Sequence, residues 1–128
     1  MHRHRQLQSP PPPIVRDLRA YQEAVLLADA VHEATGSFTR VNSRRHAEQM
    51  RASAESVYAN IAEGFGRPTM ADRGRFLSFA WASLLELEGH AQHAANCGLL
   101  LAEHAAEIRN RARWTGRLLH ALRRKTRG

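Results

Sequence analysis

The 128-residue sequence contains a single cysteine, Cys97, which excludes an intramolecular disulfide bond. It has no apolar run near the roughly 20 residues that a membrane-spanning helix needs, so we expect no membrane partner. Residues 1–8 also lack the apolar core of a secretory signal. These absences together predict a cytoplasmic protein, because the cytoplasm keeps an unpaired cysteine reduced.

The sequence also lacks the alternating pattern of β-strands. Apolar residues instead recur at steps of three and four, which predicts helices over about residues 14–35, 43–65, 70–97 and 101–124. Short connections make sequential helices antiparallel. We therefore predict an all-α fold, an up-down-up-down four-helix bundle over residues 14–124. The proline run at 10–13 makes residues 1–13 a flexible leader, and residues 125–128 form a basic tail.

Individual residues predict how the helices end and pack. We expect Gly36 to take the left-handed backbone that closes the first helix. Thr69 should cap the third helix through Asp72. Gly89 and Gly116 each cost about 1 kcal/mol relative to alanine inside a helix. A close helix contact at both glycines would explain why they are present.

Acidic residues are absent from the last twenty positions, which carry eight cations. Residues 1–19 have a net charge of +3 and the segment between has −4, within a total of +7. Basic ends of a chain commonly bind nucleic acid or another acidic surface. Cations that are only solvated, with no partner, give the same charge pattern. Few aromatic residues accompany these cations, so we expect phosphate contacts without base-specific readout. The candidate nucleic-acid-binding residues are Arg109, Arg113, Arg117, Arg123, Arg124, Lys125 and Arg127.

The motifs of common catalytic sites are missing, so we expect no enzyme activity and no cofactor. There is no Gly-x-Ser-x-Gly nucleophile elbow and no Glu-x-x-His pair of a di-metal bundle. Glu86, His90 and His93 share one helix face and could supply three metal ligands. Helical histidines are more often surface residues, so we assign no metal site. We expect Cys97 to be a small core residue.

Residues 56–67 end the second predicted helix with the sequence Ser-Val-Tyr-Ala-Asn-Ile-Ala-Glu-Gly-Phe-Gly-Arg. An inward-facing polar side chain here needs a partner, because an unpaired one costs about 1–3 kcal/mol. We expect Glu63 to hold the turn between the second and third helices, as a clasp, by an ion pair with Arg67 or Arg73. We expect Asn60 to form a hydrogen bond with a backbone group of the same turn. The structural motif residues are Asn60, Glu63, Gly64, Arg67, Glu86 and Glu88. The last two are expected to meet arginines across helices.

The Asn-Ile-Ala-Glu-Gly stretch at 60–64 resembles the signature of a four-helix-bundle family encoded in intervening sequences of bacterial large-subunit rRNA genes. Residues 76–88, which end in Ser-Leu-Leu-Glu-Leu-Glu, are similar to that family's third-helix pattern. The resemblance covers about residues 16–122. It implies a homopentameric ring related to the accessory variability protein of diversity-generating retroelements, a basic pentamer that binds nucleic acid and a reverse transcriptase.

From the residues and the resemblance we predict a non-enzymatic oligomeric module that binds RNA or DNA through a basic rim. A reverse transcriptase is a candidate protein partner. Two alternatives stay open. The first is a protein-binding scaffold, because a second apolar row on the third helix, Leu77, Trp81 and Leu84, calls for a further partner. The second is a metal-dependent bundle enzyme that uses Glu86, His90 and His93.

Overall fold

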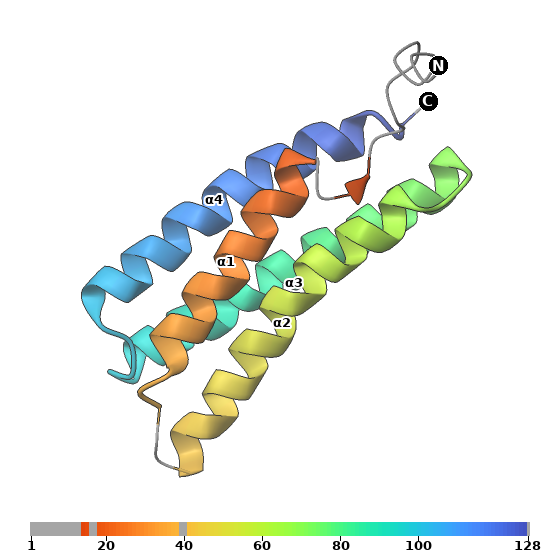
Figure 1. Ribbon diagram of the computed structural model, residues 1–128. Coiled ribbons are helices and arrows are strands. Elements are labelled where there is room, and N and C mark those ends of the chain that lie inside the picture. Colours follow the sequence, from red (N-terminus) through yellow and green to blue (C-terminus); the bar gives the residue numbers. More distant parts are fainter. Residues whose placement is uncertain (1–13, 16–17, 39–40, 128) are drawn as a thin grey trace, which may run out of the picture.

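The computed structural model describes residues 14–15, 18–38 and 41–127. The predicted leader at 1–13 lies outside these residues, as does the last residue of the predicted basic tail. The described residues form four helices and no strand, which confirms the predicted all-α fold (Figure 1). The helices are α1 (Arg19–Thr35), α2 (Val41–Phe65), α3 (Met70–Asn96) and α4 (Ala102–Arg124).

The four helices stand at the corners of a square. α1 packs on α2, α2 on α3, α3 on α4, and α4 returns to α1. Sequential helices run in opposite directions, so the start of α1, the α2–α3 turn and the end of α4 share one end of the bundle (Figure 1). We call it the Gly64 end. The Cys97 end is the opposite one, where α3 ends and α4 begins.

One continuous apolar core lies between the helices. Its largest fully buried side chains include Leu27, Met50, Ile61, Leu87 and Leu119, and complete burial of such a side chain contributes about 1.5–3 kcal/mol. Buried alanines from all four helices fill the remaining space. No helix of the described residues is long and apolar enough to cross a membrane.

The apolar row of Leu77, Trp81 and Leu84 belongs to this core. Leu77 and Leu84 are buried, and Trp81 is half-buried against the core cluster. The prediction that this row needs a further partner is wrong, because α3 packs against both α2 and α4 and so buries a wide stripe. The large apolar side chains that α3 does expose are Met70, Phe79 and Leu85.

The helix ends follow local chemistry with two corrections. α1 begins at Arg19, later than the expected residue 14, since the backbone of Leu18 is still extended (φ −77°, ψ 126°). Thr69 caps α3 as predicted, and its Oγ1 accepts a hydrogen bond from the Asp72 amide at 3.1 Å. The prediction for Gly36 is wrong, because it keeps a right-handed helical backbone (φ −61°). The chain turns at Gly36 and Ser37, where the Phe38 amide donates to the Thr35 carbonyl at 3.1 Å, and the buried Phe38 side chain joins the core.

Among the described residues, the glycine with a left-handed backbone is Gly98, with φ 75°. The Gly98 amide donates to the Ala95 carbonyl and the Leu99 amide to the Ala94 carbonyl, both at 3.0 Å. This pair of bonds is the Schellman motif, which satisfies carbonyls that the end of a helix leaves open. The end of α3, including Cys97, is therefore held in one defined conformation.

Three helical glycines differ in what surrounds them. A Cβ on Gly64 would meet the Arg73 carbonyl oxygen and the Phe76 Cβ at 3.2 Å, so its missing side chain lets α2 and α3 approach closely. A Cβ on Gly116 would lie 3.4 Å from Leu84 of α3. A Cβ on Gly89 would have nothing within 4 Å, so the close contact expected there is not made among the described residues.

Candidate nucleic-acid interface

Four arginines form a stripe along the outside of α4. We define the arginine stripe as Arg109, Arg113, Arg117 and Arg124, whose spacing of four, four and seven puts them on one helix face. All four are exposed, and none of the ion pairs between described residues involves them. Their charges are therefore available to an external anion.

The other cations of this segment are placed differently. Arg123 is half-buried, because its guanidinium lies 5.3 Å from the centre of the Trp81 ring and Nη2 donates to Ser78 Oγ at 3.4 Å. Arg123 thus holds α4 against α3, although we predicted it as a nucleic-acid contact. Lys125 and Arg127 are exposed in the turn that follows α4.

Arg111 ties α4 to α1. Its Nη1 donates to Glu23 Oε1 at 3.2 Å, and its Nε lies 3.5 Å from Glu107 Oε2. Two carboxylates neutralise this arginine, so it adds little to the positive surface. In this basic segment the arginine stripe is therefore free to contact an external anion, whereas Arg111 and Arg123 contact neighbouring helices.

Aromatic side chains border the arginine stripe. Trp114 is 52% exposed, and the Arg117 guanidinium lies 5.4 Å from its ring centre. A groove between α3 and α4 is lined by Trp81 and Leu85 on one side and by Arg113 and Arg117 on the other. The sequence argument from few aromatics overlooked Trp81, because only the packing of α3 beside α4 brings it to the basic segment.

The motif at the Gly64 end forms a surface clasp. Arg67 Nη2 donates to Glu63 Oε2 at 2.7 Å, and Arg73 Nε donates to the Arg67 carbonyl at 2.7 Å. Glu63 and Arg67 are an exposed pair one helical turn apart, and such pairs contribute about 0.3–0.5 kcal/mol. The expectation that Glu63 faces inward is wrong.

Asn60 bonds within its own helix instead of bonding the turn. Its Nδ2 donates to the Ser56 carbonyl at 2.9 Å and to Ser56 Oγ at 3.0 Å. Ser56 Oγ in turn lies 2.8 Å from Ser83 Oγ of α3. The expected bond to the turn is thus replaced by a polar link between α2 and α3.

Glu86 and Glu88 do not pair with arginines among the described residues. Glu86 Oε2 lies 3.6 Å from Nε2 of His90 in the same helix. Glu88 is exposed and forms no ion pair with a described residue. The expected cross-helix arginine partners are therefore not found among the described residues, where both glutamates are exposed on α3.

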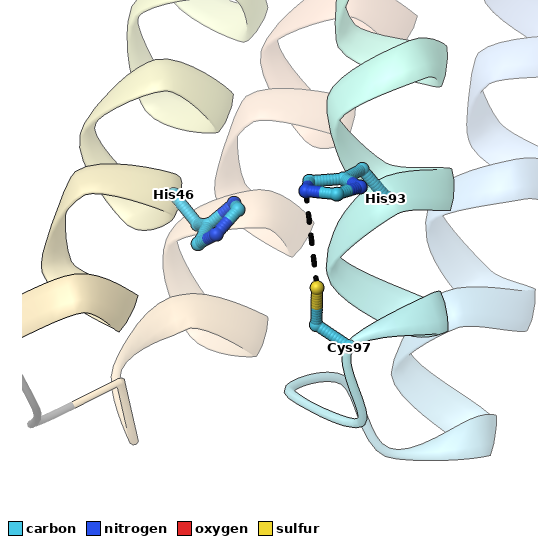
Figure 2. Close-up of side chains that lie close together, drawn as sticks. All are labelled: His46, His93 and Cys97. Atoms are coloured by element: carbon cyan, nitrogen blue, oxygen red, sulfur yellow. Dashed lines mark hydrogen bonds between the residues drawn. The ribbon is translucent and has the colours of Figure 1, made fainter.

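The alternative metal ligands Glu86, His90 and His93 do not converge on one point; among the described residues the three potential ligands that do are His46, His93 and Cys97. His93 lies instead beside His46 of α2, with ring centres 5.1 Å apart. Cys97 joins this pair, and its Sγ lies 3.8 Å from His93 Nε2 (Figure 2). Cys97 is exposed, so its predicted core position is wrong.

Comparisons with known proteins agree with this fold. The family model described as 23S rRNA-intervening sequence protein matches residues 16–121. A crystal structure of a protein with unknown function from the S23 ribosomal protein family of Bacteroides thetaiotaomicron superposes with a TM-score of 0.73. The two sequences are 20% identical, and the match covers 81% of this chain and 97% of the other, which shows a shared fold. No curated protein matches the sequence.

Proposed function

The chain belongs to the 23S rRNA-intervening sequence protein family, and we propose that it is a non-enzymatic oligomeric module that binds nucleic acid through the arginine stripe. The observation that carries this proposal is the exposure of four aligned arginines without carboxylate partners among the described residues. Their helical spacing suits a phosphate backbone, which is recognised by charge and does not require base contacts. Lys125 and Arg127 extend the same charge beyond α4.

Binding to a labelled structured RNA and to duplex DNA across a salt series tests the proposal. If the four stripe arginines each contact one phosphate, the logarithm of the binding constant falls against the logarithm of salt with a slope of about −3.6 on duplex DNA. A steep slope on either probe supports phosphate contacts. The absence of binding at low salt contradicts the nucleic-acid module and favours a protein-binding scaffold.

Self-association into a homopentameric ring is part of the proposal. Support comes from α3, whose outer surface leaves Phe79 45% and Leu85 53% exposed. Ala82 and Gly89 are also exposed there, and Gly89 has open space around it. Small residues beside large apolar ones allow another helix to approach closely. In a ring, the arginine stripe of each protomer would repeat around the rim and strengthen the positive field.

Replacing Leu85 by glutamate is expected to break the assembly, because a charge would be buried in an apolar subunit contact. Light scattering should then give a mass near 14.4 kDa for Leu85→Glu, in place of about five times that value for the parent protein. Leu26→Glu is the matched control, since Leu26 of α1 is 41% exposed on another face. A monomeric parent protein at micromolar concentration would contradict the ring.

The scaffold alternative uses the same outer surface of α3. A protein partner that covers Phe79 and Leu85 would compete with self-association, so the two uses are distinguishable by mass. A reverse transcriptase is the partner that the resemblance implies. Within either alternative we place the protein in the cytoplasm, where its single thiol stays reduced.

A further inference from the structure

Three side chains of the kind that bind transition metals converge at the Cys97 end. His46 comes from the second turn of α2, whereas His93 and Cys97 come from the last turn of α3 and its cap. Figure 2 shows the three side chains directed toward one another. The ligand atoms that they offer all lie within 4.8 Å of one another, and two of the three are exposed.

The backbone holds two of these ligands in register. The Cys97 amide donates to the His93 carbonyl at 3.0 Å, so the thiol lies one helical turn from the imidazole. The Schellman motif at Gly98 fixes the chain immediately beyond Cys97. His46 is supplied by α2, the helix with which α3 shares its most extensive contact. A metal ion would therefore meet a site whose parts are positioned in advance.

We propose that His46, His93 and Cys97 form a zinc site. Tetrahedral Zn²⁺ has bonds of about 2.3 Å to sulfur and 2.0–2.1 Å to nitrogen, which separate a sulfur and a nitrogen ligand by about 3.6 Å and two nitrogens by about 3.3 Å. The observed Sγ to Nε2 distance of 3.8 Å already matches. Small side-chain rotations bring the remaining atoms from within 4.8 Å to the required separation.

The ligand set selects the class of metal. Two imidazoles and one thiolate are borderline and soft donors, which suit Zn²⁺ and disfavour Mg²⁺ and Ca²⁺. Three protein ligands leave the fourth tetrahedral position to water or to another donor. Because His93 and Cys97 are exposed, an ion reaches the site without opening the core.

Zinc at this position would join the beginning of α2 to the end of α3. It would act at the Cys97 end, where none of the described glycines makes a contact as close as that of Gly64 with α3. The site is independent of the arginine stripe, whose four residues lie on α4. Failure of nucleic-acid binding therefore leaves the zinc proposal intact, and the reverse is also true.

Equilibrium titration of the full chain with Zn²⁺ against a chromophoric chelator tests this site. We expect one ion per chain, and Co²⁺ in its place should give a thiolate-to-cobalt charge-transfer band. Cys97→Ser should remove that band, and both Cys97→Ser and His46→Gln should weaken Zn²⁺ binding by about 100-fold or more, because the loss of a hydrogen-bond partner behind a ligand already costs about 10–100-fold. At a free zinc concentration one hundred times the Kd, the Tm of the parent protein should rise by about 10 °C.

Two controls keep the result specific. His104→Gln changes a half-buried histidine outside the trio and should leave Zn²⁺ binding unchanged. His2→Gln with His4→Gln removes the histidines nearest the amino terminus of the sequence. The proposal is overturned if Cys97→Ser binds Zn²⁺ as tightly as the parent protein, or if Co²⁺ gives no charge-transfer band; loss of binding in the His2 and His4 variant together with retained binding in Cys97→Ser would place the ion at the amino-terminal histidines. Equal Tm values of Cys97→Ser and the parent without zinc show that the variant folds.

Discussion

Replacing Arg113 and Arg117 by glutamine is expected to lower the affinity for duplex DNA about 60-fold at 0.1 M salt. Each phosphate contact contributes about 0.9 to the slope of the logarithm of the binding constant against the logarithm of salt. The loss of two contacts makes this slope about 1.8 shallower, which at 0.1 M salt corresponds to a binding constant about 60-fold lower. Both residues are exposed in the middle of the arginine stripe, and glutamine keeps helix propensity. Fluorescence anisotropy across the salt series measures the affinity and the slope together.

The matched control replaces Arg44 and Arg45 by glutamine. These arginines are exposed on α2, which stands diagonally across the bundle from α4, and the net charge changes by the same amount. We expect the affinity of this double variant for duplex DNA to fall by less than about 3-fold, because it keeps all phosphate contacts of the arginine stripe. Equal losses in the two double variants would show that overall charge, and not the stripe, drives binding.

Gly64→Val is expected to destabilise the fold by about 3 kcal/mol. A Cβ at this position would lie 3.2 Å from the Arg73 carbonyl oxygen, and the α3 backbone that carries this oxygen cannot move without disturbing the turn. Valine adds two further methyl groups on a stiff side chain. Urea denaturation followed by circular dichroism should show the transition midpoint at a lower concentration with an unchanged slope.

Gly89→Val is the control for the same chemical change in open space, and both glycine variants are compared in the Leu85→Glu background, so that the proposed subunit contact beside Gly89 does not contribute. Nothing described lies within 4 Å of a Cβ at this position, and valine has a slightly better helix propensity than glycine. We expect its effect on the free energy of unfolding to stay within about 0.5 kcal/mol. Similar decreases in the free energy of unfolding for Gly64→Val and Gly89→Val would contradict the close approach of α2 and α3 at Gly64.

Much of the fold could be predicted because the signals are local. The helix ends at Phe65 and Met70 follow from glycines and a proline between two apolar stripes, and Thr69 caps α3 with an ordinary side-chain bond. Gly36 and Gly98 show where local signals fail. Both follow a helix. Gly98 is left-handed, as the Schellman bonds of Gly98 and Leu99 require, whereas Gly36 keeps a right-handed backbone in a turn closed by the bond from the Phe38 amide to the Thr35 carbonyl.

The candidate sites were harder to predict, because they depend on pairs distant in sequence. The spacing of the arginine stripe is visible in the sequence, whereas the pairing of Arg111 with Glu23 joins residues 88 positions apart. His46 and His93 likewise come together only through the register of α2 against α3. No spacing motif links the two in the sequence, which instead places His93 on one face with Glu86 and His90 of its own helix.

The start of α1 and the end of α4 share the Gly64 end of the bundle, and the two helices pack side by side. Leu18, just before α1, and Leu122, near the end of α4, line the same cavity there. The packing of the four helices therefore does not depend on which helix ends the chain connects. A circularly permuted chain, with α4 linked to α1 and new termini cut between α1 and α2, would retain the helix packing described above and the Arg67 contacts of the α2–α3 turn.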